Sequence, residues 1–314
     1  MHSPAVIDLH CDTLTAFMAP GRCRNTLNDP GSDFALRKVP AGACWAQCCA
    51  IFIPDELRGT QAIRYYEAYQ KSFVRQMTEC SPLAVPCSTA AQLEQAWAQG
   101  KVAAILTVEN GSALAGDLDR LEVLARDGVK AVTLSWNGQN EIASGWETDH
   151  GLSDFGRVLI PAMEQQGVLV DVSHLNDRSF YDVLERAQKP FLATHSNARS
   201  VCSHRRNLTD DQIREMVSRR CLIGLNYTDH FLRDGGGATP EDLFRHIARF
   251  LDLGAEDCLA LGSDFDGTTL PEFLNSPAKV LHLPDYLQSR GLSAALCRKI
   301  LFQNALTFFQ ANLS

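Results

Sequence analysis

The chain has 314 residues, of which 45% are hydrophobic and 21% are charged, and its formal net charge is −8. A chain of this length buries one large core, so we expect a single domain over residues 1–314. The acidic balance, without lysine and arginine clusters interleaved with aromatic residues, excludes a nucleic-acid-binding surface. No run reaches the roughly 18 apolar residues that span a bilayer, and no signal-peptide pattern opens the sequence, so we expect a cytoplasmic protein without a membrane partner.

Eleven cysteines do not form a disulfide framework in this interpretation, because their number is odd and several lie inside apolar runs such as 44–53. Paired CxxC segments with zinc-ribbon spacing are absent from the sequence. We expect buried, reduced thiols.

Short apolar runs alternate with amphipathic stretches along the whole chain. The expected strands are residues 5–9, 44–53, 102–108, 129–135, 167–173, 190–194, 221–226 and 258–263. The expected helices include residues 60–79, 117–127, 154–166, 176–188, 209–219 and 240–253, with Ser153, Asn176 and Thr209 as capping residues. Eight alternations of this kind predict an α/β fold, a (β/α)8 TIM barrel of the metallo-dependent hydrolase type.

Three further segments complete the expected barrel. Residues 20–43 are rich in proline and glycine without periodicity, and we expect a long first loop that forms part of a substrate lid. The triplet Gly235-Gly236-Gly237 predicts a mobile loop, and residues 292–312 predict one or two helices that close the outer ring.

Ionisable side chains follow the predicted strands at their carboxyl ends, where βα barrels carry their active sites. His10 and Asp12 end the first strand and Glu109 the third. His174 and His195 end the fifth and sixth. Alone, His174 has an alternative role as a satisfied barrel histidine and His195 as a helix cap, but the joint pattern predicts a metal site.

The HxD spacing directs His10 and Asp12 to one face of a strand, so both can bind one ion. Imidazole and carboxylate are ordinary zinc ligands, and five of them exceed the need of a single catalytic zinc. We therefore expect two zinc ions, with Glu109 bridging them and His174 and His195 on the second ion. Such a pair activates water near neutral pH and polarises a carbonyl. The other histidines (His2, His150, His204, His230, His246 and His282) are expected not to be ligands.

Two further segments carry charges near the expected site. The eighth strand is followed by Asp264 and Asp266, and we favour Asp264 because it lies nearest the strand end. Arg205 and Arg206 lie in the loop after the sixth strand, where a guanidinium either clamps a substrate carboxylate or pairs with a neighbouring aspartate.

The segments VIDLHCDT, TVENG, DVSHL, ATHSNARSVCSHRRNLTDDQI and GSDFDG occur in this order, and together they resemble the membrane (renal) dipeptidase family of zinc peptidases, in its bacterial type. The resemblance extends from about residue 5 to residue 310. It implies a dinuclear zinc barrel and a homodimer. It also implies hydrolysis of a dipeptide by a metal-bridging hydroxide, with tolerance for a D-residue at the carboxyl end.

The resemblance also assigns roles to single residues. The metal ligands would be His10, Asp12, Glu109 as the bridge, His174 and His195. Arg206 would bind the carboxylate of the substrate. Asp264 would contact the substrate amine and transfer a proton during amide cleavage.

One departure from the family pattern concerns the substrate. The renal enzymes carry a histidine at the end of the fourth strand where this chain has Trp136. An indole has one N–H donor and cannot become cationic, so oxyanion stabilisation would depend more on the metals, or Trp136 packs the pocket wall. After the seventh strand, Tyr227 or Phe231 takes the place of the aromatic substrate contact of the family.

Two alternatives stay open beside a zinc dipeptidase. The same metals could serve an amidohydrolase acting on another small amide or ester, such as an N-acyl amino acid, a lactone or a cyclic amide, because a fold does not fix its substrate. A non-catalytic metal-binding protein is the other alternative.

Overall fold

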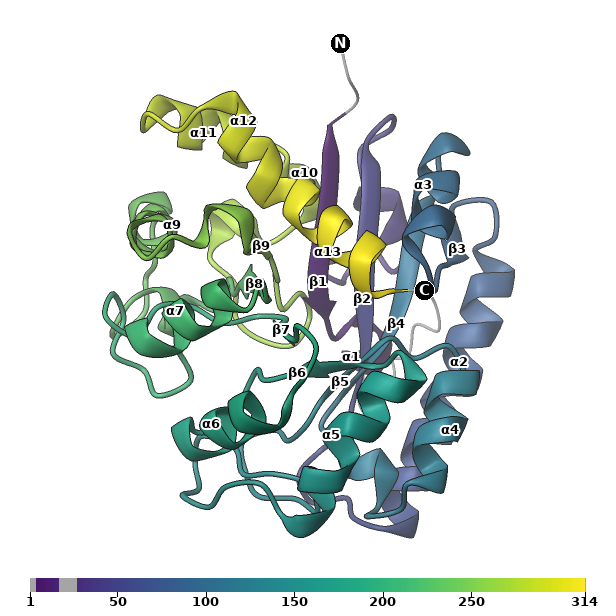
Figure 1. Ribbon diagram of the computed structural model, residues 1–314. Coiled ribbons are helices and arrows are strands. Elements are labelled where there is room, and N and C mark those ends of the chain that lie inside the picture. The colour runs from purple at the N-terminus through teal and green to yellow at the C-terminus, as the bar shows by residue number, and fades with distance from the viewer. Residues whose placement is uncertain (1–3, 17–26, 314) are drawn as a thin grey trace.

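A parallel β-sheet forms the centre of the computed structural model, which describes residues 4–16 and 27–313 (Figure 1). Its strands are β1 (Ala5–Cys11), β2 (Cys44–Phe52), β3 (Ala84–Pro86), β4 (Val102–Glu109), β5 (Ala131–Thr133), β6 (Leu169–Asp171), β7 (Leu192–Ala193), β8 (Leu222–Leu225) and β9 (Leu259–Leu261). The strand order β2-β1-β9-β8-β7-β6-β5-β4 closes through the pairing of β2 with β4, whereas β3 pairs only with β4. The chain is therefore a closed eight-stranded parallel barrel, which confirms the predicted fold class.

Each of the eight predicted strands contains or overlaps one strand of the ring. The third strand of the chain, β3, was not predicted, because it has only three residues and ends on Pro86. Proline lacks the N–H that a central strand donates, so β3 remains an edge beside β4.

Helices connect the strands and cover the outside of the barrel (Figure 1). They are α1 (Thr13–Ala16), α2 (Thr60–Glu79), α3 (Ala90–Ala98), α4 (Asp119–Arg126), α5 (Asp154–Gln166), α6 (Asp177–Arg186), α7 (Asp210–Ser218), α8 (Asp229–Leu232), α9 (Pro240–Asp252), α10 (Pro277–Val280), α11 (Leu283–Ser289), α12 (Ala294–Arg298) and α13 (Asn304–Asn312). Ser153, Asn176 and Thr209 cap α5, α6 and α7 through their side chains, as predicted. No helix of the described residues is both long and apolar enough to cross a membrane.

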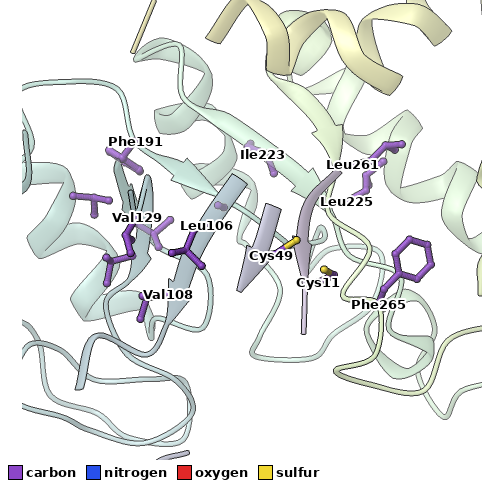
Figure 2. Packing of buried hydrophobic residues seen from close by; sticks show 14 of the residues in the cluster. Cys11, Cys49, Leu106, Val108, Val129, Phe191, Ile223, Leu225, Leu261 and Phe265 are labelled. Carbon is purple, nitrogen blue, oxygen red and sulfur yellow. The ribbon is translucent and has the colours of Figure 1, made fainter. Parts of the chain in front are cut away.

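The hydrophobic core has an outer and an inner layer. The outer layer packs strand side chains such as Leu106, Val108 and Ile223 against the helices (Figure 2). The inner layer fills the barrel with residues from all eight ring strands, among them Ile7 and Ile105. Residues of α3 and α13 complete this inner layer at the amino ends of the strands, so the opposite, carboxyl end is left for a site.

Two predicted loops have the following structure. The described part of the first loop, residues 27–43, contains a short 3-10 helix at Leu36–Lys38. It lines no part of the cavity at the carboxyl end of the barrel that is described below, and residues 20–26 lie outside the described residues. The glycine triplet follows α8 with φ values of 84°, 79° and 71°, a conformation that glycine adopts without strain. Its predicted mobility stays a prediction.

Candidate metal centre

The five predicted ligands meet at the carboxyl end of the barrel. His10 lies near the end of β1 and Asp12 follows the strand directly, while Glu109 is the last residue of β4. His174 and His195 come just after β6 and β7. All five are at most 8% exposed, so the barrel brings ionisable groups from four strands into one buried cluster.

A bulge in β1 directs its two ligands toward the cluster. Asp8 pairs with Gln47 and Cys11 with Cys49, so three steps along β1 match two along β2. The sulfur atoms of Cys11 and Cys49 lie near each other on these strands (Figure 2). A β-bulge of this kind changes the direction of the side chains that follow it. Strand alternation alone therefore did not predict how His10 reaches the barrel mouth.

Distances within the cluster place nitrogen and oxygen donor atoms around both carboxylate oxygens of Glu109. The Nε2 atom of His10 lies 3.6 Å from Oδ2 of Asp12 and 3.5 Å from Oε2 of Glu109. The other carboxylate oxygen of Glu109, Oε1, lies 2.8 Å from Nε2 of His174 and 3.7 Å from Nε2 of His195. Glu109 thus presents one oxygen to His10 and the other to His174 and His195.

The hydrogen-bond partners of His174 leave its Nε2 free for an ion. Oδ1 of Asn137 lies 2.7 Å from the indole Nε1 of Trp146 and 3.0 Å from Nδ1 of His174. An indole N–H only donates, so the Asn137 atom is an acceptor and Nδ1 of His174 carries the proton. The lone pair of its Nε2 then faces the cluster.

A second chain of hydrogen bonds does the same for His195. The Thr194 hydroxyl donates to the buried Asp171 carboxylate at 2.6 Å and therefore accepts from Nδ1 of His195 at 2.7 Å. Asp171 also accepts from the Thr133 hydroxyl at 2.5 Å. Hydrogen bonds behind metal-bound histidines commonly fix the ring in this way.

Burial and neighbouring charge shift the protonation of the cluster. Burial lowers the pKa of His174 and of His195 well below the usual range, and Arg206 lowers both further. Burial and the neighbouring Asp12 raise the pKa of Glu109 to about 8. Burial opposes protonation of His10, but Glu109 and Asp12 outweigh it and raise its pKa. The metal-free cluster thus holds neutral imidazoles at His174 and His195, whereas the neighbouring carboxylates favour protonation of His10. Nitrogen and carboxylate donors of this kind favour cations, which displace the protons.

A second observation, buried donor atoms without hydrogen-bond partners, also indicates that the cluster binds a divalent metal. Nε2 of His10 and Oδ1 of Asp12 are buried atoms without a hydrogen-bond partner. Buried polar atoms rarely remain unsatisfied, and unexplained ones indicate an ion or water. Nitrogen and carboxylate oxygen donors in this number suit zinc or a similar first-row metal.

Asp264, which the sequence favoured over Asp266, lies beside the cluster. Its Oδ1 is 4.0 Å from Nε2 of His10, and its Oδ2 accepts from the Asn226 amide at 3.1 Å and the Thr228 hydroxyl at 3.2 Å. Burial raises its pKa, and His10 opposes this shift. The following Gly267 is required by space, because a Cβ there would lie 2.1 Å from Oδ2 of Asp12.

Asp266 has a different position. Its carboxylate accepts hydrogen bonds from the Thr13 hydroxyl at 2.7 Å and from the backbone N–H of Asp33 at 2.6 Å. It therefore anchors the first loop at the cavity rim. Both Asp264 and Asp266 have positive φ, 62° and 66°, a conformation that non-glycine residues adopt mostly at functional turns.

Arg206 is a buried cation behind the second pair of ligands. It is 3% exposed and donates to the Ser196 hydroxyl and to the His195 carbonyl, both at 2.9 Å. Its Nε has no partner, and it forms no ion pair with a carboxylate of the described residues. Burial lowers its pKa to about 10, so the guanidinium stays charged at neutral pH. By contrast Arg205 is exposed and pairs with Asp149 at 3.2 Å.

A cavity of about 770 Å³ opens onto the cluster. Asp12, Glu109, His174 and Asp264 form its floor. Its lining also includes six aromatic residues, Phe52, Tyr65, Tyr69, Trp136, Trp146 and Phe231. This volume is in the range of small-molecule sites.

The predicted aromatic contacts differ in position. Trp136 lies in the cavity wall, where its ring packs edge-on against Phe52 with centroids 4.9 Å apart. Tyr227 is fully buried against Phe265 and does not line the cavity, whereas Phe231 does. The structure therefore favours Phe231 over Tyr227 for a direct contact.

The remaining histidines of the described residues are not members of the candidate metal groups, and His2 lies outside the described residues. His246 is a buried structural residue that bonds to the Leu232 carbonyl at 3.0 Å. Sequence reasoning missed Asn137, Asp171 and Thr194. Asp171 had a signal, because a lone carboxylate in the apolar run VLVDVS needs a buried partner.

Comparisons with known proteins match one family model over nearly the whole chain and one relative over most of it. The family model of the membrane dipeptidases, peptidase family M19, matches residues 1–312. A Klebsiella pneumoniae protein named as uncharacterized, in the pqqA 5′ region, is 33% identical over 232 residues, which cover 70% of this chain and 86% of the relative.

Two solved structures are similar over nearly the full length. One is a dipeptidase of family M19, described as a metallopeptidase, with a TM-score of 0.93 and 27% identity, covering 100% of this chain and 99% of its own. The other is a Rhodobacter sphaeroides metallopeptidase bound to a phosphinate mimic of the dipeptide L-Ala-D-Ala, with a TM-score of 0.92 and 26% identity, covering 99% and 100%.

Proposed function

The chain belongs to the membrane dipeptidase family and is a metallodipeptidase, and from this premise we propose that it is a dinuclear zinc enzyme that cleaves dipeptides, including those with a D-residue at the carboxyl end. The observation that carries the two-metal proposal is the facing pair of imidazole nitrogens of His174 and His195, 3.0 Å apart beside Glu109. The substrate proposal draws support from the related structure bound to the L-Ala-D-Ala mimic.

His10 and Asp12 would hold one zinc ion, His174 and His195 the other, and Glu109 both. The unpartnered donor atoms of His10 and Asp12 support the first site, and the free lone pairs of His174 and His195 support the second. When bound, the ions would activate the attacking water and polarise the scissile carbonyl.

Arg206 would bind the substrate carboxylate. It supplies a buried positive charge without a carboxylate partner among the described residues. An unpaired buried cation is costly, and a bound carboxylate removes that cost. A bidentate contact of this kind would also orient the amide toward the metals.

Asp264 would contact the substrate amine and donate a proton to the leaving nitrogen. It lines the cavity beside the metal cluster, and burial raises its pKa, a shift in the direction that favours the protonated form of a proton donor. The Asn226 and Thr228 hydrogen bonds hold one oxygen and leave the other toward the cluster.

Trp136 would form the substrate wall in place of a cationic residue. It has no charge with which to stabilise an oxyanion, so this stabilisation would depend on the metals. A second candidate function is the hydrolysis of N-acyl amino acids. The aromatic lining of the cavity suits an acyl group, and these compounds also carry a carboxylate for Arg206.

The barrel would be the single catalytic domain of residues 1–314. A reducing, cytoplasmic compartment is supported by nine free cysteines of the described residues, eight of which are buried; Cys80 is not counted among them.

A substrate panel tests the proposal. Zinc-loaded protein is incubated with L,L- and L,D-dipeptides and with the matching N-acetyl amino acids, and the released amino acids are quantified. We expect both dipeptide classes to be cleaved and the N-acetyl compounds to remain intact. Intact dipeptides beside a cleaved N-acetyl amino acid would contradict the proposal.

A further inference from the structure

Trp146, Asn137 and His174 form a closed ring of hydrogen bonds at the edge of the metal cluster. We propose that Asn137 is a positioning residue that fixes the tautomer and orientation of His174 for metal binding, and that Trp146 fixes Asn137 in turn. The inference rests on the proposed function, in which His174 holds one of the two metals.

Three contacts make the ring. The Trp146 indole donates to Oδ1 of Asn137 at 2.7 Å, and Nδ1 of His174 donates to the same oxygen at 3.0 Å. The backbone N–H of Trp146 donates to the His174 carbonyl at 2.9 Å. Each residue of the ring therefore bonds to both of the others.

The ring defines the direction of the Asn137 amide. If the amide were reversed, its NH2 group would face the indole N–H, and two donors would meet. With the oxygen in place, the proton of His174 lies on Nδ1, and the lone pair of Nε2 points toward Oε1 of Glu109 at 2.8 Å. A neutral histidine with this tautomer is the form that a metal binds.

His174 lies outside the regular strand, so strand pairing does not hold its imidazole in place. The residue has φ of +68° and lies beyond β6, outside the regular strand. Non-glycine residues in this left-handed region persist where neighbours hold them. The bond from Trp146 to the His174 carbonyl supplies this support at the backbone, and Asn137 supplies it at the imidazole.

The loop that carries Asn137 is itself fixed. The Gly138 N–H donates to the Asp55 carboxylate at 2.7 Å, and the Gly145 N–H donates to the Gly138 carbonyl at 2.7 Å. A Cβ at Gly145 would lie 1.9 Å from the Trp136 carbonyl oxygen, so only glycine permits this approach. The loop thus holds Asn137 in a defined position before a metal binds.

Trp146 joins this ring to the substrate cavity, because its side chain also lines the cavity wall. Trp136 lines the same wall, but among the described residues its side chain makes no hydrogen bond to Asn137. The two tryptophans therefore form a matched pair in which only one has the proposed role.

Zinc affinity tests the proposal without substrate. Metal-free protein is titrated with zinc in competition with a chromophoric chelator, and cobalt-loaded protein is compared by its visible absorption spectrum. We expect Asn137→Ala to weaken one of the two zinc sites by about 10–100-fold, and to leave the other unchanged. Asn137→Asp should retain both affinities, because a carboxylate accepts both N–H groups. Trp146→Phe keeps an aromatic side chain but loses the indole N–H that donates to Asn137. We expect one zinc site to weaken by about 2–10-fold in this variant.

Trp136→Phe is the control and should leave both zinc affinities and the cobalt spectrum unchanged. Zinc affinities within twofold of the parent protein in Asn137→Ala, or an equal loss in Asn137→Asp, would overturn the proposal. If Asn137→Ala fails to fold, Trp146→Phe decides, because unchanged affinities there contradict the proposed ring. His174→Ala separates the two levels of inference: zinc binding unchanged in this variant would refute the proposed ligand set itself.

Discussion

The Nε2 atoms of His174 and His195 lie 3.0 Å apart, although the hydrogen bonds of both rings put the proton on the opposite nitrogen. Two lone pairs at this distance repel each other unless a cation lies between or beside them. Oε1 of Glu109 adds a third electron-rich atom, 2.8 Å from Nε2 of His174. This relationship is the physical basis of the two-metal proposal, and the predictions below test its parts.

Glu109→Gln should weaken both zinc sites, because Glu109 offers one oxygen to each pair of ligands. An amide keeps the shape but loses the negative charge and one oxygen lone-pair donor. Metal content after dialysis, measured by atomic emission, should fall below one zinc per chain. The exposed Glu79→Gln is the control. Loss of only one zinc in Glu109→Gln would argue against a bridging role.

Arg206→Ala should lower kcat/KM for dipeptides by about 30-fold or more, since removing one partner of a buried charge pair costs about 2–5 kcal/mol. The change should lie mainly in KM, and zinc content should stay at the parent value. Arg205→Ala is the matched control, because Arg205 is exposed and pairs with Asp149. A loss of zinc in Arg206→Ala would contradict the assigned role.

Asp264→Asn should lower kcat by about 10²–10⁴-fold, because an amide cannot transfer the proton that the leaving nitrogen requires. Its hydrogen bonds from Asn226 and Thr228 can persist at the retained oxygen, so folding and zinc content should not change. Steady-state kinetics with metal analysis on the same samples checks this. Parent-like kcat would exclude Asp264 from proton transfer.

Trp136→Ala should raise KM for dipeptides with large apolar side chains more than KM for glycylglycine. The indole packs against Phe52 and lines the cavity, so its removal deletes apolar contact area. In Trp136→Phe, KM for these dipeptides should lie between the values of the parent protein and of Trp136→Ala. Equal effects on all dipeptides would show that Trp136 does not contact the substrate side chain.

Metal-free protein should lose stability as pH rises from about 6.5 to about 8. The pKa of Glu109 is raised from 4.5 to about 8 in the fold, so its contribution is complete below 4.5 and is lost as pH rises toward 8. The raised pKa of His10 also makes stability fall as pH rises. The lowered pKa values of His174 and His195 have the opposite effect, but only below about pH 6.5.

Over this window the uptake difference of one proton lowers the free energy of unfolding by about 2 kcal/mol in total. Thermal melts of metal-free protein at several pH values measure it, and Glu109→Gln should melt with a weaker pH dependence. A Tm that rises from pH 6.5 to pH 8 would contradict the charge distribution of the cluster.

The barrel could be predicted because each strand and helix is marked by a pattern in its own short stretch of sequence. Each ring strand is a short apolar run next to an amphipathic stretch, and the carboxyl ends of parallel strands meet at one rim. Ligand candidates such as His10, Glu109 and His195 could therefore be placed together from strand ends alone. The edge strand β3 was not predicted, because three residues ending in proline show no periodic pattern of apolar residues.

The surroundings of the ligands were not predictable, because they depend on contacts between distant segments. Asn137 meets His174 across 37 positions, and the bulge that aims His10 requires the register of β1 against β2. The family resemblance offered Tyr227 or Phe231 as the aromatic substrate contact. Phe231 lines the cavity, whereas the Tyr227 side chain is buried against Phe265.

A zinc titration of activity tests the central claim most directly. Metal-free protein receives increasing equivalents of zinc, and the release of D-alanine from L-Ala-D-Ala is followed at each step. The account predicts that activity rises to a plateau at two equivalents per chain. A plateau at one equivalent, or no hydrolysis at any zinc level in folded protein, would contradict it.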